Sequence, residues 1–166
     1  MFIGFIWRLI VISQFHKTFT SSMIIHKIFI LLFGCASIAC VAGEADCGPL
    51  TNHFGPFDYN SAPLYDRKLV ERPHFPPHVE QLRKGNTASL GGDISYTLEV
   101  FPNHPRALNS MANLAIRQKR AKPEDSRYSV DCWFDRAIRF RSEDPAVRMI
   151  YAVYLSKLLT RQSNSG

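Results

Sequence analysis

The sequence lacks the signatures by which many enzymes and nucleotide-binding proteins are recognised. Nowhere in its 166 residues is there a Walker A phosphate loop, a GxGxxG turn, an HExxH zinc motif or a GxSxG nucleophile motif. The formal net charge is +6, but no run of five or more basic residues occurs, which argues against a nucleic-acid-binding tail. With 46% hydrophobic and 20% charged residues, the composition is that of a folded protein. We therefore expect one domain that is not an enzyme and that carries neither a cofactor nor a metal.

A hydrophobic run long enough to cross a membrane is also missing. The longest uncharged apolar stretch, residues 28–41, has about fourteen residues, whereas a spanning helix needs about 20. His26 and Lys27 precede it, and the small residues of segment 42–45 follow it. A short positive segment, a short apolar core and an exit of small residues make up a secretory signal peptide. We predict that residues 1–45 are such a signal and that the mature protein is periplasmic or secreted.

Three alternatives to this interpretation of the N-terminus stay open. Met23 would begin a more ordinary signal than Met1, in which case the residues before it are an over-long N-terminus. The apolar run could instead stay uncleaved and anchor the protein in a membrane through residues 28–42. Cys35 and Cys40 each follow a small residue, as the lipid-carrying cysteine of a lipoprotein does. All three concern the first 45 residues and leave the predictions for the rest of the chain unchanged.

Cysteine is scarce in the rest of the chain. Outside the predicted signal only Cys47 and Cys132 remain. Two cysteines in an exported protein meet an oxidising compartment, which favours a disulfide between them. The alternative is that Cys132 is a small buried apolar residue and Cys47 a free thiol near the terminus. Because the sequence has no CxxC motif, we expect no thiol-exchange chemistry.

Residues 46–75 show neither a helical nor an alternating apolar period. Gly-Pro occurs in them twice, at 48–49 and 55–56, and proline and glycine at this density disfavour helices and central strands. The same segment is nevertheless too apolar for a free tail. We expect an extended arm over residues 46–75 that packs on the folded body through its apolar side chains, namely Phe54, Phe57, Tyr59, Leu64 and Tyr65.

From Pro76 onward the apolar residues recur three and four positions apart, which predicts helices. No segment alternates over four or more residues, so the predicted fold class is all-α, made of antiparallel helical hairpins with short connections. We expect this helical domain to span residues 76–160 and the polar residues 161–166 to form a disordered tail. The expected helices lie between Pro76 and Gly85, between Gly91 and Pro102, and onward from Pro105, from Val130 and from Pro145.

The helical part contains a repeated joint between helices. Residues 101–108 and 141–148 align with each other at a separation of 40 residues. A period of about 30–45 residues with two helices per unit is typical of helical repeats. The pattern resembles the tetratricopeptide repeat (TPR) family. The matching residues are Ala112 and Ala152 on the first helix of the pair, Phe134 and Ala137 on the second, and Pro102 at the joint.

The resemblance is incomplete in three ways. The repeat is longer than that of the family, Ser142 stands where proline is usual, and the last unit stops after its first helix. The resemblance implies a short solenoid with a surface for a protein or peptide. The segments CGPL…GPFDY and YTLEVFPNHPRAL also resemble exported bacterial proteins of unknown function that carry TPR-like helices. That second resemblance implies a Gram-negative periplasmic setting and brings no known substrate.

Two groups of side chains are candidates for binding a peptide. Lys119 and Arg120 lie in a basic turn, and with Arg136 they would suit an acidic peptide or a lipid head group. Tyr128 and Tyr154 are the aromatic residues that helix packing leaves free in this interpretation. The alternative for the basic residues is an ordinary solvated turn and a helix end. The other aromatic residues of this region belong to the helix-packing core in this interpretation, namely Trp133, Phe134 and Tyr151.

Other polar residues predict no site. His74 and His78 are four residues apart, but two prolines interrupt the turn between them and no further metal ligand follows. Asp58, Asp66 and Glu71 could be imagined as an acid–base pair, yet nothing in the sequence links them.

The sequence therefore predicts an exported TPR-like scaffold that mediates a protein or peptide interaction in the cell envelope. We expect no nucleic-acid partner and no membrane span in the mature chain. The alternative is a structural or assembly-linked envelope protein whose unpaired C-terminal helix docks on another chain.

Overall fold

The computed structural model describes residues 47–163. The predicted signal over residues 1–45, with its membrane-anchor and lipid alternatives, lies outside the described residues. In the described part the chain forms helices and no strand, so the predicted all-α class is confirmed. The helices are α2 (Leu64–His74), α3 (Pro77–Glu80), α4 (Leu90–Val100), α5 (Pro105–Gln118), α6 (Val130–Phe140) and α7 (Pro145–Ser163).

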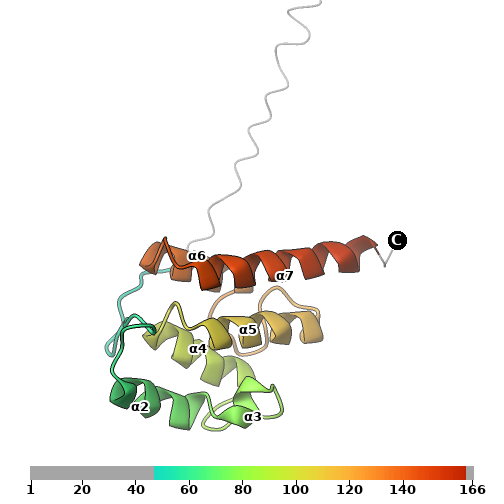
Figure 1. Ribbon diagram of the computed structural model, residues 1–166. Coiled ribbons are helices and arrows are strands. Elements are labelled where there is room, and N and C mark those ends of the chain that lie inside the picture. Colours follow the sequence, from blue (N-terminus) through green and yellow to red (C-terminus); the bar gives the residue numbers. More distant parts are fainter. Residues whose placement is uncertain (1–46, 164–166) are drawn as a thin grey trace, which may run out of the picture. The chain divides into compact units, whose positions relative to one another are not determined.

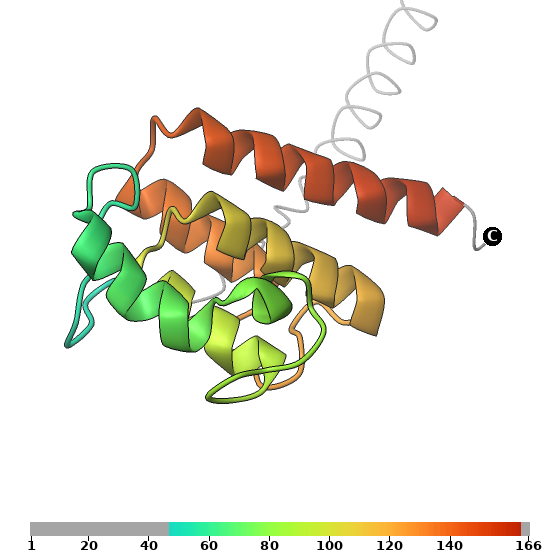
Figure 2. The same cartoon turned by 60° about the horizontal axis from the view of Figure 1, so that its bottom comes forward.

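The helices form a stack with two ends. At one end lie α2 and α3, α4 and α5 occupy the middle, and α6 and α7 form the other end (Figure 1). Helix α4 contacts α2, α3 and α5, whereas α7 contacts α5 and α6. In the second view, Figure 2, α7 again lies at the edge of the group of helices. One long face of α7 is therefore left without a neighbouring helix.

The helix starts follow from local chemistry. The side chains of Ser89 and Ser129 accept hydrogen bonds from the N–H groups of Gly92 and Cys132, which makes these serines the N-caps of α4 and α6. Helices α5 and α7 both begin at a proline, which loses nothing by lacking an N–H in the first turn.

The two joints that align in the sequence also share their local structure. The N–H of His104 donates to the carbonyl of Phe101 at 3.0 Å, and the N–H of Asp144 donates to the carbonyl of Arg141 at 3.2 Å. In each joint the residue before the proline then caps the next helix, since the side chains of His104 and Asp144 accept N–H groups of its first turn. The joints are thus equivalent turns at equivalent places.

The arm is shorter than predicted. Residues 64–74 were expected to be extended, but they form α2, with Pro73 in its last turn. The clustering of glycine and proline ends at Pro63, and the segment after it is rich in Leu, Arg, Lys and Glu, which favour helix. Burial of Val70, which is 1% exposed, holds this helix on the body. The irregular arm is therefore residues 47–63.

Part of the arm packs as expected and part does not. Phe54 and Tyr59 lie against a small core cluster that contains Phe101. The backbone N–H of Phe57 donates to the carbonyl of Val100 at 2.8 Å, but the side chain of Phe57 is 36% exposed. Leu64 and Tyr65 were expected to be covered, but they are 57% and 75% exposed on the outer face of α2. They are exposed because α2 turns Val70 inward, and its opposite face lies at the end of the stack.

Two helix boundaries also differ from prediction. The first helix was expected to reach Gly85, but α3 ends at Glu80 and Leu82 adopts a positive φ of 57°. The disordered tail was expected from residue 161, but α7 continues to Ser163. Residues 164–166 of that tail lie outside the described residues. Apolar residues recur at helical spacing along α7 as far as Leu158, so a further turn of helix adds hydrogen bonds at little cost.

The main core lies between α3, α4, α5, α6 and α7. The apolar stripe of α6 is buried as the sequence predicts, with Trp133 at 1% exposure and Phe134 and Ala137 at 0%. The rings of Phe134 and Tyr151 stack with their centroids 4.5 Å apart. Other buried members of this core are Ile94, Leu98, Leu108, Met111, Leu114 and Val147.

Candidate functional site: a basic hollow beneath the last helix

The N-terminal end of the arm is bound to α6. The sulfur atoms of Cys47 and Cys132 are joined in a disulfide, which is the pair that the sequence predicted. One nitrogen of Arg136, Nη1, donates to the carbonyls of Cys47 and Pro49 at 3.0 and 2.7 Å. Arg139 adds a bond to the carbonyl of Gly48 at 3.1 Å. The start of the arm is thus attached both covalently and by charged hydrogen bonds.

Arg136 was a predicted peptide-binding residue, and the structure places its side chain beneath the arm instead of on the surface. Its side chain is only 2% exposed, and its guanidinium is taken up by carbonyls of the arm. Burial lowers the pKa of Arg136. A basic residue on a polar stretch of sequence cannot be recognised as buried until the arm that covers it is placed.

Tyr128 was also predicted to be free for a ligand, and it instead packs beneath the arm. The guanidinium of Arg136 lies 4.7 Å from the centre of its ring, and its ring meets that of Trp133 edge to face at 5.1 Å. Its hydroxyl oxygen approaches Gly48 so closely that a Cβ there would lie 2.6 Å away, and Gly48 has a positive φ of 69°. The positive φ favours glycine at position 48, and a Cβ there would in addition require the Tyr128 side chain to shift.

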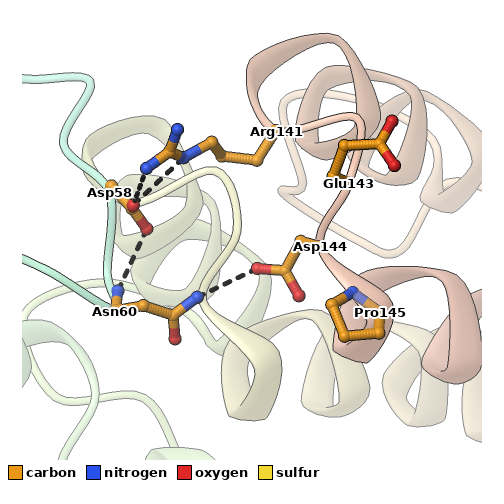
Figure 3. A pocket seen from close by; sticks show the side chains of 6 residues that line it. All are labelled: Asp58, Asn60, Arg141, Glu143, Asp144 and Pro145. Atoms are coloured by element: carbon orange, nitrogen blue, oxygen red, sulfur yellow. Dashed lines mark hydrogen bonds and ion pairs between the residues drawn. The ribbon is translucent and has the colours of Figure 1, made fainter.

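A second set of contacts holds the arm on the two joints. The Asp58 carboxylate accepts hydrogen bonds from Arg141 and Asn103, and the Asn60 side chain donates to Asp144 at 3.0 Å. Figure 3 shows Asp58, Asn60, Arg141 and Asp144 around an open pocket, whose volume is about 340 Å³. Burial alone would raise the pKa of Asp58, but the hydrogen bonds from Arg141, Asn103 and the Asn60 backbone lower it to about 2. Because the carboxylates of Asp58 and Asp144 already accept hydrogen bonds from protein groups, we interpret this cluster as one that holds the arm on the joints and not as a ligand site.

A third cluster ties the arm to α2 and α5. The Glu71 carboxylate accepts from the hydroxyl of Tyr59 and from Arg106 at 2.9 and 2.6 Å, and it lies 3.1 Å from Nε2 of His104. The hydrogen bond to His104 is the main cause that lowers the pKa of Glu71 to about 2. Burial lowers the pKa of His104. Asp58 and Glu71 thus bond to different partners, and the structure assembles no acid–base pair from them.

The remaining predicted residues meet at a hollow of about 440 Å³ under the C-terminal half of α7. Lys119 and Arg120 reach it from the end of α5, and Tyr154 reaches it from α7. Lys119 ends α5 with a positive φ of 57°, a conformation that glycine adopts more easily than any other residue. The residues that line the hollow are Ala115, Lys119, Arg120, Ala121, Asp131, Tyr154, Leu158, Arg161 and Gln162.

Tyr154 is buried, which corrects the expectation that it is free on the surface. It is 3% exposed and packs its ring against Phe134, with centroids 6.2 Å apart. Its hydroxyl makes no hydrogen bond with the residues that the structure describes, although Tyr154 lines the hollow. Burial, and then the charge of Asp131, raise the pKa of Tyr154, so the hydroxyl keeps its proton. A ligand in the hollow would find there an unused hydrogen-bond donor.

The charge of the hollow is mostly positive. Lys119, Arg120 and Arg161 line it together with a single carboxylate, Asp131. Asp131 accepts a hydrogen bond from the hydroxyl of Tyr151 at 3.2 Å. Arg161 uses Nη1 to bond the carbonyl of Ile116 at 2.8 Å, which leaves other donors of its guanidinium for a ligand. The arrangement can therefore hold a carboxylate beside apolar walls.

Sequence reasoning missed Leu158 and Arg161 as part of the hollow. The polar end of the chain had been assigned to a disordered tail from residue 161. A signal was nevertheless present, since Tyr154, Leu158 and Arg161 are spaced by four and three and so lie on one face of a helix. Leu158 already lay in the predicted helix, and continuing the helical period by one turn would have added Arg161 to the same face.

Among the described residues there is no cluster of three or more metal-binding side chains. His74 lies with Nδ1 2.8 Å from the hydroxyl of Thr87 and 3.2 Å from the carboxylate of Asp93, in a contact between α2 and α4. No helix in residues 47–163 is long and apolar enough to cross a membrane. No protein-family model, no curated protein and no solved structure matches this chain.

Proposed function

We propose that this protein is an exported interaction module, a TPR-like scaffold that binds a protein or peptide in the cell envelope. The observation that carries the proposal is the hollow under α7. It is bordered by three cations, Lys119, Arg120 and Arg161, and by the unused hydroxyl of the buried Tyr154. Its volume of about 440 Å³ lies in the usual range of small-ligand sites.

The other elements of the proposal rest on weaker support. The disulfide between Cys47 and Cys132 is typical of proteins that leave the reducing cytosol. The TPR-like character is supported by the two equivalent joints that precede α5 and α7. The Gram-negative periplasm as the destination follows from the sequence resemblance alone.

The charge of the hollow favours a peptide with a carboxylate. Lys119 and Arg120 are exposed and can form charge-assisted hydrogen bonds. The apolar walls supplied by Ala115, Ala121 and Leu158 would cover the aliphatic part of the same peptide. Each such contact is weak, so we expect affinities in the micromolar range, on the order of −8 kcal/mol.

Selection from a displayed peptide library, followed by binding measurements on variants, tests this function. Tyr154→Phe removes only a hydroxyl that has no partner in the described chain, so it should weaken binding and leave stability unchanged. Lys119→Gly should weaken binding while the backbone keeps its positive φ without strain. Lys122→Ala is the matched control, because Lys122 is an exposed cation of the same turn outside the hollow. Equal affinity of all three variants would exclude the hollow as the binding site.

A second candidate function is assembly: the protein would dock on another envelope protein through α7. One observation favours it. Helix α7 exposes Met149, Val153, Leu155 and Leu159, with exposed fractions of 40–68%. Sedimentation of the purified protein with and without Leu159→Asp would test whether this face joins two chains.

A further inference from the structure

The outer face of α7 has the composition of a helix–helix interface. Met149, Val153 and Leu159 recur along it and are 68%, 45% and 67% exposed. Ala152 and Ser156 lie between them, also exposed and one turn apart. Small residues at this spacing let a second helix approach closely, while the larger residues beside them supply apolar contact.

The charges that border this face have one sign. In its 19 residues α7 contains no aspartate or glutamate. Arg148 and Lys157 are its exposed cations, and they lie on opposite edges of the apolar stripe. Their structural bonds are to an uncharged carbonyl and an uncharged amide, those of Ser142 and Asn113. No carboxylate of the described chain pairs with either cation.

The apolar residues of α2, at the other end of the stack, provide an internal comparison. Leu69 is 50% exposed there, but its helix carries both Asp66 and Lys68 on its surface. Helix α2 thus has mixed charge around its exposed apolar residues, whereas α7 has only positive charge. The single sign is a property of α7 and not of exposed helices in this protein generally.

We infer that the outer face of α7 binds an amphipathic helix of another protein whose apolar stripe is bordered by acidic residues. This rests on the assembly function proposed above and specifies the partner's chemistry. Apolar contact would come from Met149, Val153 and Leu159, and the acidic edges of the partner would lie along Arg148 and Lys157. Complementary charge on both edges sets the register and excludes helices of the wrong sign.

The two other occupants of such a face are disfavoured by the same residues. The α7 of a second copy would bring only Arg148, Lys157 and Arg161 as ions, all of the sign already present. A membrane surface is usually bound through bulky aromatic residues and many cations. The outer stripe instead has Ala152 and Ser156 at its centre and no aromatic residue.

The test uses two synthetic peptides of about 18 residues, or five helical turns. Both have leucine along one helical face, and the edges of that face are glutamate in one peptide and lysine in the other. The protein is purified after expression of the full chain, and binding is followed by fluorescence anisotropy. We expect the glutamate peptide to bind about ten-fold more tightly or better, because a like-charged helix is repelled.

Variants make the expectation specific to α7. Leu159→Asp should weaken binding of the glutamate peptide about ten-fold or more, whereas Leu69→Asp on α2, the matched control, should leave it unchanged. The double variant Arg148→Glu, Lys157→Glu should reverse the preference toward the lysine peptide. Thermal melting of each variant verifies that the fold is retained.

Several results would overturn the inference. Equal binding of the two peptides would exclude a preference for an acidic partner but would still support docking on α7. Binding of neither peptide would remove both the inference and the assembly function. A dimer that Leu159→Asp dissociates would assign the face to a second copy, and attachment to phosphatidylglycerol vesicles that Leu159→Asp abolishes would assign it to a membrane. Loss of peptide binding in Tyr154→Phe alone would move the site to the hollow.

Discussion

The arm, which has no regular secondary structure, is attached to the body more extensively than α7, which is a regular helix. Residues 47–63 have no helix or strand, yet they are fastened by a disulfide, by Arg136 and by the Asp58 cluster. Helix α7 is the longest helix described, yet only one of its faces contacts the body. Regular backbone hydrogen bonding and attachment to the body are therefore separate properties. In this protein the irregular segment is the covered one, and the regular segment offers the free surface.

The largest effect is expected where α7 meets the core. Phe134→Ala removes a ring that is 0% exposed and stacks on Tyr151 of α7. Truncating a buried phenylalanine costs about 3–5 kcal/mol in unfolding free energy. Chemical denaturation would measure it, and hydrogen exchange should show α7 loosening more than the arm. A loss below about 1 kcal/mol would mean that the stripe of α6 is not the core.

The second prediction concerns the disulfide, whose loss should affect the arm before it affects the helices. Replacing both Cys47 and Cys132 by alanine removes the disulfide and should cost about 2–4 kcal/mol, since a long loop is no longer closed in the unfolded chain. The arm should then become sensitive to protease before any helix does. Mass spectrometry of the first fragments would identify the cut. An initial cut within α7 would show that the arm is held by its other bonds alone.

The third prediction uses acid to release the arm. The pKa of Asp58 is lowered from 3.8 to about 2, and that of Glu71 from 4.5 to about 2. Because the unfolded carboxyls take up protons first, the stabilisation from both groups is complete above about pH 4.5 and is lost as the pH falls toward 2.

Helix α7 contains no carboxyl group, so hydrogen exchange should increase over residues 47–63 in this window before it increases over α7. The variant Asp58→Asn, which keeps an oxygen acceptor but cannot titrate, should reduce the pH dependence. If exchange rose equally in both regions at every pH, the Asp58 and Glu71 clusters would not be what holds the arm.

The smallest effect is expected on the outer face of α7. Met149→Ser changes a side chain that is 68% exposed, so unfolding free energy should change by less than about 0.5 kcal/mol. A thermal melt would measure the change, with Val147→Ser on the buried face of the same helix as the contrasting variant. A clear loss of stability from Met149→Ser at low protein concentration would mean that the outer face is covered.

Much of the fold follows from local sequence signals. Prolines at 105 and 145 mark the starts of α5 and α7, and the apolar period of α6 predicts the burial of Trp133 and Phe134. The error over residues 64–74 came from extending the glycine–proline composition past Pro63, although the residues that follow favour helix. That error could have been avoided from the sequence.

The candidate site was less accessible to prediction. Lys119 and Arg120 are in the hollow as a basic turn suggests, but Arg136 and Tyr128 are taken up by the arm and Tyr154 by the core. Arginine, lysine and tyrosine side chains each have an apolar part and a polar end, so they can be exposed to water or buried against a carbonyl. The sequence does not indicate which of the two applies. Only the three-dimensional neighbours of each side chain distinguish the two cases.

Spacing and residue type within short segments were enough to predict the helical class and the starts of most helices, and elimination was enough to predict the pair of cysteines. Which side chains remain available for a ligand depends instead on the packing of distant segments. That packing brought Arg136 under carbonyls about 87 residues away in the chain, closed the hollow with the last turn of α7, and left one face of that helix bare. Such outcomes depend on which distant segments meet, and local spacing carries no record of that.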